Sequence, residues 1–144
     1  MESVTDDGVI SVLSRIRHSD GSPSDVYDVH CTVKILEYKL QRLGAKRKYT
    51  FVEKITDVMD HFKVRRSSDL YQGIRFILKV RNAFAHSQGI YCFRDAETSV
   101  EKYVRVFEKV EAALDDMIFD MEEEEERRRH RKRARSLGNA SASD

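Results

Sequence analysis

The sequence has few of the residues that disulfide-rich, metal-binding or turn-rich domains need. Its two cysteines, Cys31 and Cys92, stand alone and form neither a CxxC pair nor a zinc-binding spacing. One proline and six glycines in 144 residues favour long helices over a β-rich fold with many turns. The sequence offers neither a glycine-rich phosphate loop nor a metal-ligand cluster, so no cofactor and no metal is expected.

Membrane and secretion signals are also missing from the sequence. No apolar run approaches the length of a bilayer span, and residues 1–7 lack the basic-then-apolar order of a secretion signal. The formal net charge is +1, so bulk charge gives no argument for nucleic-acid binding. We therefore expect a soluble, cytoplasmic protein with reduced thiols and one compact domain.

Charged and apolar residues are plentiful, and they alternate with a helical rhythm. Charged residues make up 35% of the chain and hydrophobic residues 40%, which fits helices with a buried stripe and a charged outer face. Apolar residues recur every three or four positions over about residues 23–43, 50–62, 69–87 and 98–121. Four long helices with short links predict an all-α fold, an antiparallel up-and-down four-helix bundle over residues 23–121.

Capping residues and glycines mark the expected helix boundaries. Capping boxes are predicted at Thr50 with Glu53 and at Thr98 with Glu101. The other expected starts and stops are at Ser22, Pro23 and Asp25, at Ser67 or Ser68, and at Gly44 and Gly89.

The segment before the bundle, residues 1–22, is expected to be an N-terminal arm with a short helix over residues 7–18. Ile10, Leu13 and Ile16 would face one side of that helix. Because this apolar stripe is thin, the helix is expected either to pack as an arm or to stay mobile.

Residues 122–144 are expected to form a charged helical extension with a disordered tail. An acidic run, Glu122 to Glu126, precedes an arginine-rich block over residues 127–135, and three of the glutamates stand four residues before an arginine. Residues 136–144 read as a disordered end. The arginine-rich block has three interpretations: a solvated helix extension, a contact for nucleic acid or an acidic partner, or a nuclear import signal in a eukaryote.

One segment near the end of the third helix combines residues that suggest chemistry: Arg81, Asn82 and His86. Metal-independent RNA cleavage needs a group that moves a proton and positive charge where the phosphorane develops negative charge. A histidine titrates near neutral pH and suits the first task, and a guanidinium offers forked donors for the second. Asn82 stands one turn before His86, where its amide is expected to orient the imidazole.

The spacing of these three residues resembles the RNxxxH signature of the HEPN superfamily of helical domains. The resemblance implies a bundle of about four helices with the motif late in the third, covering roughly residues 23–121. It also implies a homodimer in which two motifs meet at one cleft, an RNA substrate, and a role in defence or in a toxin–antitoxin pair with a neutralising antitoxin partner. Other members of the superfamily are non-catalytic dimerisation or regulatory modules. Gln88 stands where one toxin subgroup has a tyrosine.

The geometry of an ideal helix separates the motif residues. A five-residue step turns about 140°, so Arg81 and His86 do not share a face. Either the helix loosens near Ala85, or the arginine of one chain meets the histidine of another across a two-fold axis. A second, polar stripe is expected to carry Arg75, Lys79, Asn82 and His86.

Basic residues around this stripe are candidates for contacts with an RNA backbone. The predicted RNA-binding residues are Arg75, Lys79, Arg65 and Arg66, with Lys46, Arg47 and Lys48 as further members of a basic rim. For each of them ordinary solvated charge is the alternative, and it needs fewer assumptions.

Structural roles compete with the catalytic interpretation of the motif. Arg81 near an apolar face would normally pair with a carboxylate, and the candidates are Asp57, Asp60 and Glu108. His86 would be favoured by the dipole at the end of its helix. The alternative functions are a non-catalytic helical dimerisation module using the same face and a nucleotide-binding domain without cleavage.

Overall fold

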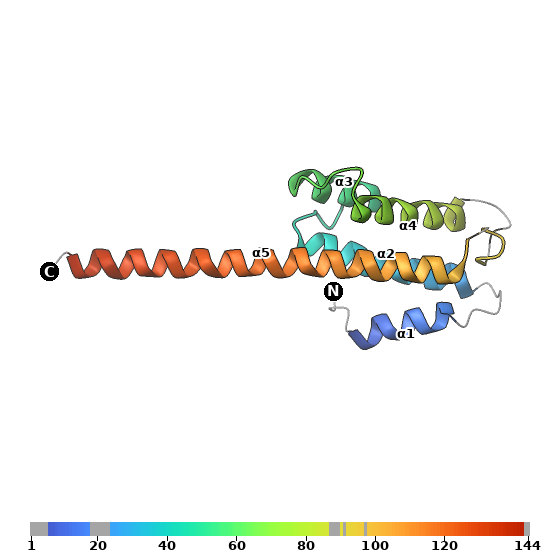
Figure 1. Cartoon of the computed structure of the whole chain (residues 1–144), viewed down its shortest axis with the longest axis horizontal. Helices are drawn as coiled ribbons and strands as arrows, with labels where there is room; N and C mark the ends of the chain where they lie inside the picture. The colour runs from blue at the N-terminus through green and yellow to red at the C-terminus, as the bar shows by residue number, and fades with distance from the viewer. Residues whose placement is uncertain (1–5, 18–23, 87–89, 91, 97, 143–144) are drawn as a thin grey trace.

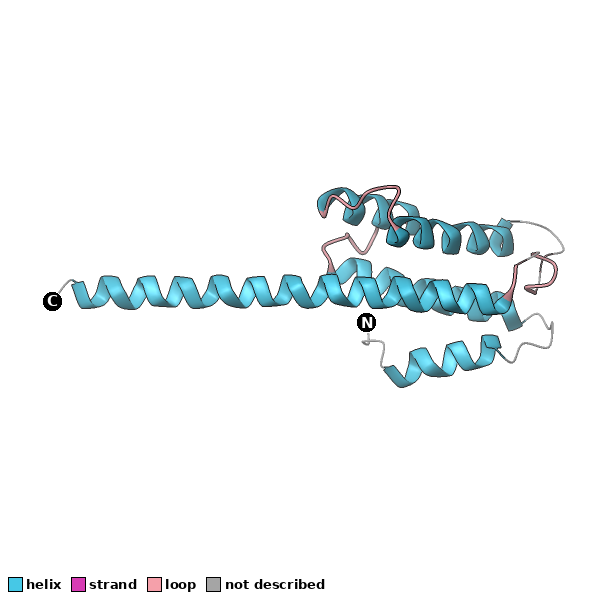
Figure 2. Ribbon diagram, viewed as in Figure 1, coloured by secondary structure: helices cyan, strands magenta, loops and turns pink. Residues whose placement is uncertain are grey.

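The computed structural model of the chain describes residues 6–17, 24–86, 90, 92–96 and 98–142 (Figure 1). All regular secondary structure in these residues is helical and forms five α-helices. They are α1 (Asp6–Arg17), α2 (Ser24–Arg42), α3 (Phe51–His61), α4 (Asp69–His86) and α5 (Val100–Ala142). The predicted all-α class is confirmed for this part of the chain (Figure 2).

Helix α2 lies at the centre of the fold, where it contacts each of the other four helices. Its apolar stripe is buried through Leu36 and Leu40, as the spacing predicts. Helix α5 packs along α4, α2 and α1 and buries Tyr103, Phe107 and Leu114 against them. The alternating apolar residues of α5 are therefore used inside this chain's own core.

The helix caps mostly follow the sequence. Thr50 and Glu53 form the predicted capping box, with the Glu53 backbone N–H donating to the Thr50 hydroxyl and the Thr50 N–H donating to the Glu53 carboxylate. Ser68 accepts from the Tyr71 N–H at the start of α4. At α5 the predicted cap is wrong by one residue, because Ser99 rather than Thr98 accepts from the Lys102 N–H.

Gly44 ends α2 with a φ of 113°, a left-handed conformation that side-chain-bearing residues rarely adopt. The next N–H, from Ala45, donates to the Leu40 carbonyl at 3.1 Å and closes the helix end. The expected boundaries at Ser22, Pro23 and Gly89 lie outside the described residues.

Helix α1 belongs to the common core, a position that the sequence left open between a packed arm and a mobile segment. Val9, Val12, Leu13 and Ile16 are buried in the same cluster as the core residues of α2 and α5. Ile10, predicted to face inward, is 64% exposed. The reason is that α1 packs against two helices at once, which buries a different and wider stripe than the one counted from Ile10.

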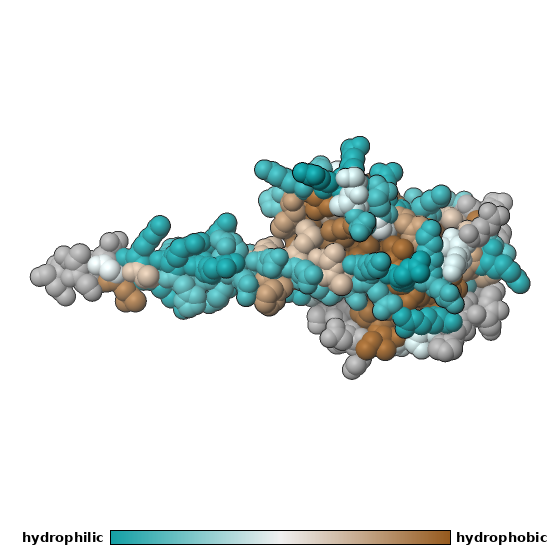
Figure 3. All heavy atoms as spheres, in the orientation of Figure 1, coloured by the Kyte–Doolittle hydropathy of each residue, from teal (hydrophilic) through white to brown (hydrophobic). Residues whose placement is uncertain are grey.

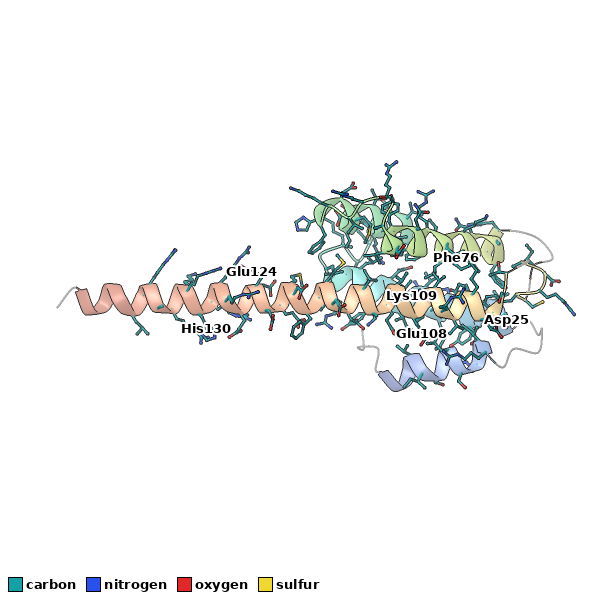
Figure 4. All side chains as sticks on the ribbon, in the orientation of Figure 1. Asp25, Phe76, Glu108, Lys109, Glu124 and His130 are labelled. Carbon is teal, nitrogen blue, oxygen red and sulfur yellow. The ribbon has the colours of Figure 1, made fainter. Side chains whose placement is uncertain are left out.

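Helix α5 is 43 residues long and projects beyond the rest of the molecule (Figure 1). Its predicted charged extension is helical, and Glu124 and His130 lie on the projecting part (Figure 4). The helix continues to Ala142, whereas the sequence predicted a disordered end over residues 136–144. A continuous helix is available here because Glu124 bonds to Arg127, Arg128 and Arg131 along its own surface.

No helix in the described ranges is both long and apolar enough to cross a membrane.

Candidate functional site

The motif residues lie on the last two turns of α4. The helix buries Ile74, Ile77, Val80 and Phe84, which fixes its rotation about its axis. Residues next to this buried stripe are consequently held at its edge or in solvent, because successive residues are rotated by about 100° around the helix axis. Arg81 and Asn82 are half-buried, whereas His86 is exposed.

The end of α4 is anchored by aromatic contacts to the connection that follows it. The Phe84 ring packs edge-on against Phe93 at 5.4 Å, and Phe93 contacts Tyr103 of α5 at 5.2 Å. The backbone N–H of Phe93 donates to the buried carboxylate of Asp25 on α2 at 3.0 Å. These contacts join α4, α2 and α5 next to the motif and hold Arg81 and Asn82 on a fixed support.

The guanidinium of Arg81 donates a hydrogen bond to the amide oxygen of Asn82 at 3.0 Å. The sequence predicted that Asn82 orients His86, and in the structure the amide oxygen of Asn82 accepts from Arg81. Within the described residues Arg81 has no ion pair with a carboxylate. Of its predicted partners, Glu108 instead pairs with Arg17 at 2.7 Å, which connects α5 to α1.

The α-helical conformation persists without interruption through His86. Of the two alternatives for joining Arg81 and His86, the structure therefore does not show the loosening of the helix near Ala85. With about 100° per residue, the two side chains leave the helix about 140° apart. The two residues therefore start from different sides of α4.

The predicted polar stripe of α4 forms a shallow hollow. Arg75, Lys79 and Asn82 line it together with Gln72, Phe76 and Leu78. His86 follows Asn82 by one further turn and is open to solvent. Two exposed cations, Arg75 and Lys79, and one amide therefore share a surface on the motif-bearing helix, which suits contact with an anion.

The other predicted RNA-binding residues lie far from the motif. Arg65 and Arg66 are exposed in the connection that precedes α4, and the carbonyl of Arg66 accepts from the Gln72 side chain at 2.6 Å. The 18 residues of α4 separate this connection from His86 by about 27 Å at 1.5 Å per residue. Lys46, Arg47 and Lys48 lie in the connection between α2 and α3. The basic rim is thus not one continuous patch on α4.

A groove between α4 and α5 has no counterpart in the sequence predictions. It has a volume of about 630 Å³ and is lined by apolar residues of both helices with Lys102 and Lys109 among them. Gly73 makes the close approach possible, because a Cβ there would lie 2.8 Å from a methyl group of Val110. The Lys102 ammonium lies over the Phe76 ring at 4.8 Å. Figure 3 shows apolar surface along this seam, bordered by hydrophilic side chains.

In the part of the chain that the structure describes, no three His, Cys, Asp or Glu side chains gather in a way that would hold a metal ion. Cys31 and Cys92 are free thiols, and the Cys92 thiol donates to the Asp95 carboxylate at 3.3 Å. Comparison with protein-family models, with curated proteins and with solved structures found no match to this chain.

Proposed function

We propose that this chain is a HEPN-like, metal-independent endoribonuclease that acts in the cytoplasm as a homodimer with an antiparallel bundle core. In the proposed site, Arg81 of one copy binds the scissile phosphate and His86 of the other copy transfers the proton. The observation that supports this most is the Arg81–Asn82 hydrogen bond. A half-buried guanidinium bonded to a neutral amide keeps its full positive charge for an anion.

The reaction follows from the chemistry of these two side chains. His86 accepts the proton of the RNA 2′-hydroxyl, the 2′-oxygen attacks phosphorus, and the bond to the 5′-oxygen breaks. The leaving 5′-oxygen takes a proton from water, and His86 afterwards returns its proton to the solvent. The products are a 2′,3′-cyclic phosphate and a 5′-hydroxyl end. Arg81 stabilises the negative charge of the phosphorane through its forked donors. Arg75 and Lys79, in the neighbouring hollow, bind the adjacent backbone.

The requirement for two copies comes from the straight helix. Because Arg81 and His86 of one chain leave α4 about 140° apart, one chain alone lacks a complete site. The same observation favours the second candidate, a non-catalytic dimerisation module that uses this face without cleaving RNA.

The direct test is RNA cleavage by purified protein with excess chelator, on structured and single-stranded RNA. Wild type is expected to cleave, and His86→Ala is expected to lose at least about a hundredfold in rate, the range for removing a general base. His30→Ala removes an exposed histidine from α2 and serves as the matched control, which should cleave like wild type. Intact RNA with wild-type protein would favour the non-catalytic module.

A mixture of two inactive variants tests the shared site. In a heterodimer of Arg81→Ala and His86→Ala chains, one of the two composite sites keeps both residues. An equal mixture that exchanges freely should therefore recover about a quarter of wild-type activity. If wild type cleaves RNA but the mixture is no more active than either variant alone, the composite site is excluded. The nuclease activity itself would still stand.

The proposed biological setting is defence or a toxin–antitoxin pair. Expression of the wild-type chain is then expected to inhibit growth of the host, and a neutralising partner would relieve the inhibition. The variant His86→Ala should be harmless at equal expression. Equal toxicity of the two proteins would exclude a toxin role that depends on RNA cleavage.

A further inference from the structure

The outward face of α5 carries an ordered series of charges that make no ion pair among the described residues. With about 100° per residue, the members of this face fall within roughly 100° around the helix, opposite buried residues such as Phe107 and Leu114. We call this face the α5 stripe. Along the helix it consists of Lys102, Arg105, Lys109, Ala112, Ala113, Asp116, Asp120 and Glu123.

The charges of the α5 stripe are segregated by sign. The three residues before the alanines are basic and the three after them are acidic, and all six are exposed. Other charges of α5 are paired across the fold, for example Glu108 with Arg17, Asp115 with Lys39 and Glu122 with Arg42. Within the described residues, none of the six stripe charges has an ion pair.

This arrangement is unfavourable in an isolated chain. Arg105 and Lys109 are like charges one turn apart, and so are Asp116 and Asp120, and such pairs destabilise a helix. Lys102 also stands in the first turn of α5, where the helix dipole disfavours a cation. A partner surface that is acidic opposite the basic half and basic opposite the acidic half would reverse each of these effects.

We propose that a second copy of this chain supplies that surface, with the two α5 stripes packed antiparallel about Ala112 and Ala113. A two-fold axis at this point puts Lys109 opposite Asp116 of the partner subunit. By the same register, Arg105 lies opposite the partner's Asp120, and Lys102 opposite the partner's Glu123. The symmetry makes every contact twice, as an isologous interface requires.

The small residues at the centre allow close approach of the two helices. Ala112 and Ala113 have no side chain beyond Cβ, so the axes can come together where the charges change sign. Phe119 lies at the edge of the same face, is 59% exposed and adds apolar surface to the contact. The pairing rests largely on exposed charges, so it is expected to weaken as salt rises.

This pairing is separate from the composite Arg81–His86 site, so a chain that forms both interfaces contacts two other copies. It places the motif-bearing ends of the two chains at opposite ends of the α5 pair. The register also brings the partner's arginine-rich block, residues 127–135, beside the connection between α4 and α5. If the proposed nuclease function holds, that block offers an RNA backbone a second cationic contact near the motif end.

Charge reversal tests the α5 pairing without touching the motif. Arg105→Glu with Lys109→Glu leaves Lys102 as the single basic residue of the stripe, and Asp116→Lys with Asp120→Lys leaves Glu123 as its single acidic residue. Each double variant should sediment as a smaller species than wild type at low salt, judged against the chain mass of 16.8 kDa. The matched control is Lys46→Glu with Arg47→Glu, the same change of charge in the α2–α3 connection, which should sediment like wild type.

Two rescues separate pairing from a general effect of charge. An equal mixture of the acidic and basic double variants should associate, because each now complements the other. The fourfold variant, with both halves reversed, is complementary to itself and should also associate. Far-ultraviolet circular dichroism, which measures helix content, checks that each variant is folded.

The proposal is overturned if wild type and the double variants sediment alike, or if both rescues fail while the variants are folded. The variant His86→Ala, which is expected to lose RNA cleavage, should sediment like wild type. Failure of the nuclease proposal is therefore visible separately from failure of the pairing.

Discussion

The hydroxyl groups of Thr32 on α2 and Tyr103 on α5 lie 2.7 Å apart inside the core, and both residues are fully buried. Thr32 also donates to the Val29 carbonyl at 2.6 Å, which uses its only hydroxyl proton. Tyr103 is therefore the donor between the two hydroxyls. Burial raises the pKa of Tyr103, so the phenol stays protonated and keeps this role at neutral pH.

Because Tyr103 is the donor, substitutions of Tyr103 and of Thr32 should lower the free energy of unfolding by different amounts. Tyr103→Phe should lower the free energy of unfolding by about 1 kcal/mol, the net value of one hydrogen bond. Thr32→Val should cost about 2 kcal/mol, because it leaves the phenol as a buried donor without an acceptor. The double variant should cost less than the sum. Urea unfolding curves measure all three, and strictly additive losses would contradict the direct bond.

Gly73 allows α4 and α5 to approach closely, so a methyl group there should separate them. In Gly73→Ala the added Cβ would meet a methyl group of Val110 at 2.8 Å and one of Val106 at 3.4 Å. The stiff valine side chains give way poorly, so overpacking of about 2 kcal/mol should exceed the helix-propensity gain of about 1 kcal/mol. Thermal unfolding should show a lower Tm, and adding Val110→Ala should relieve the clash. A higher Tm in Gly73→Ala would mean that α4 and α5 are not tightly packed at this position.

Glu53 should contribute to stability in a pH-dependent way. The hydrogen bond from the Thr50 backbone N–H holds the pKa of this carboxyl below its usual 4.5. A carboxyl with a lowered folded pKa stabilises the fold above its unfolded pKa, and this contribution is lost as pH falls through the folded value. Glu53→Gln should therefore be less stable than wild type at pH 7, with a difference that shrinks below pH 4.5.

The matched control for this measurement is Glu125→Gln, an exposed glutamate on the projecting part of α5. Its urea midpoint should follow wild type across the same pH range. A difference between wild type and Glu53→Gln that stays constant from pH 7 to acid would show that the carboxylate charge has no part in the cap.

Asn82→Asp tests whether the charge of Arg81 matters for RNA. The substitution keeps the shape of the side chain but replaces the amide with a carboxylate beside the guanidinium. The fold should be at least as stable, because an ion pair replaces a neutral hydrogen bond. RNA cleavage and RNA affinity should nevertheless fall, by about tenfold or more, since the positive charge is now compensated. Unchanged cleavage would mean that Arg81 acts only in packing.

The sequence predicted the helices well because their signals are local. The capping box at Thr50 and the glycine stop at Gly44 depend on residues within one or two turns, and both are present. Where two local signals competed, the prediction failed by a single position, as at Ser99. Residues 136–142 were predicted to be disordered because of their polar composition. In the structure the preceding helix continues into them.

The candidate site was predicted as a set of residues but not as a set of contacts. The spacing of Arg81, Asn82 and His86 indicated a site, yet only the structure showed that Asn82 bonds to Arg81. The carboxylate partner proposed for Arg81 depended on which helices are adjacent. Glu108 faces α1 and meets Arg17, a residue 91 positions away in the chain. The periodicity along one helix does not indicate which other helix lies beside it.

By itself, then, the sequence determined where the chain is helical and which stripe of most helices is apolar, because those properties arise from neighbours three or four residues apart. The tertiary structure alone decided that α1 joins the core, that a glycine lets α4 and α5 meet, and that the six charges of the α5 stripe make no ion pair within the described residues. Each of these depends on which helices lie side by side, and that is a matter of packing between segments distant in the chain.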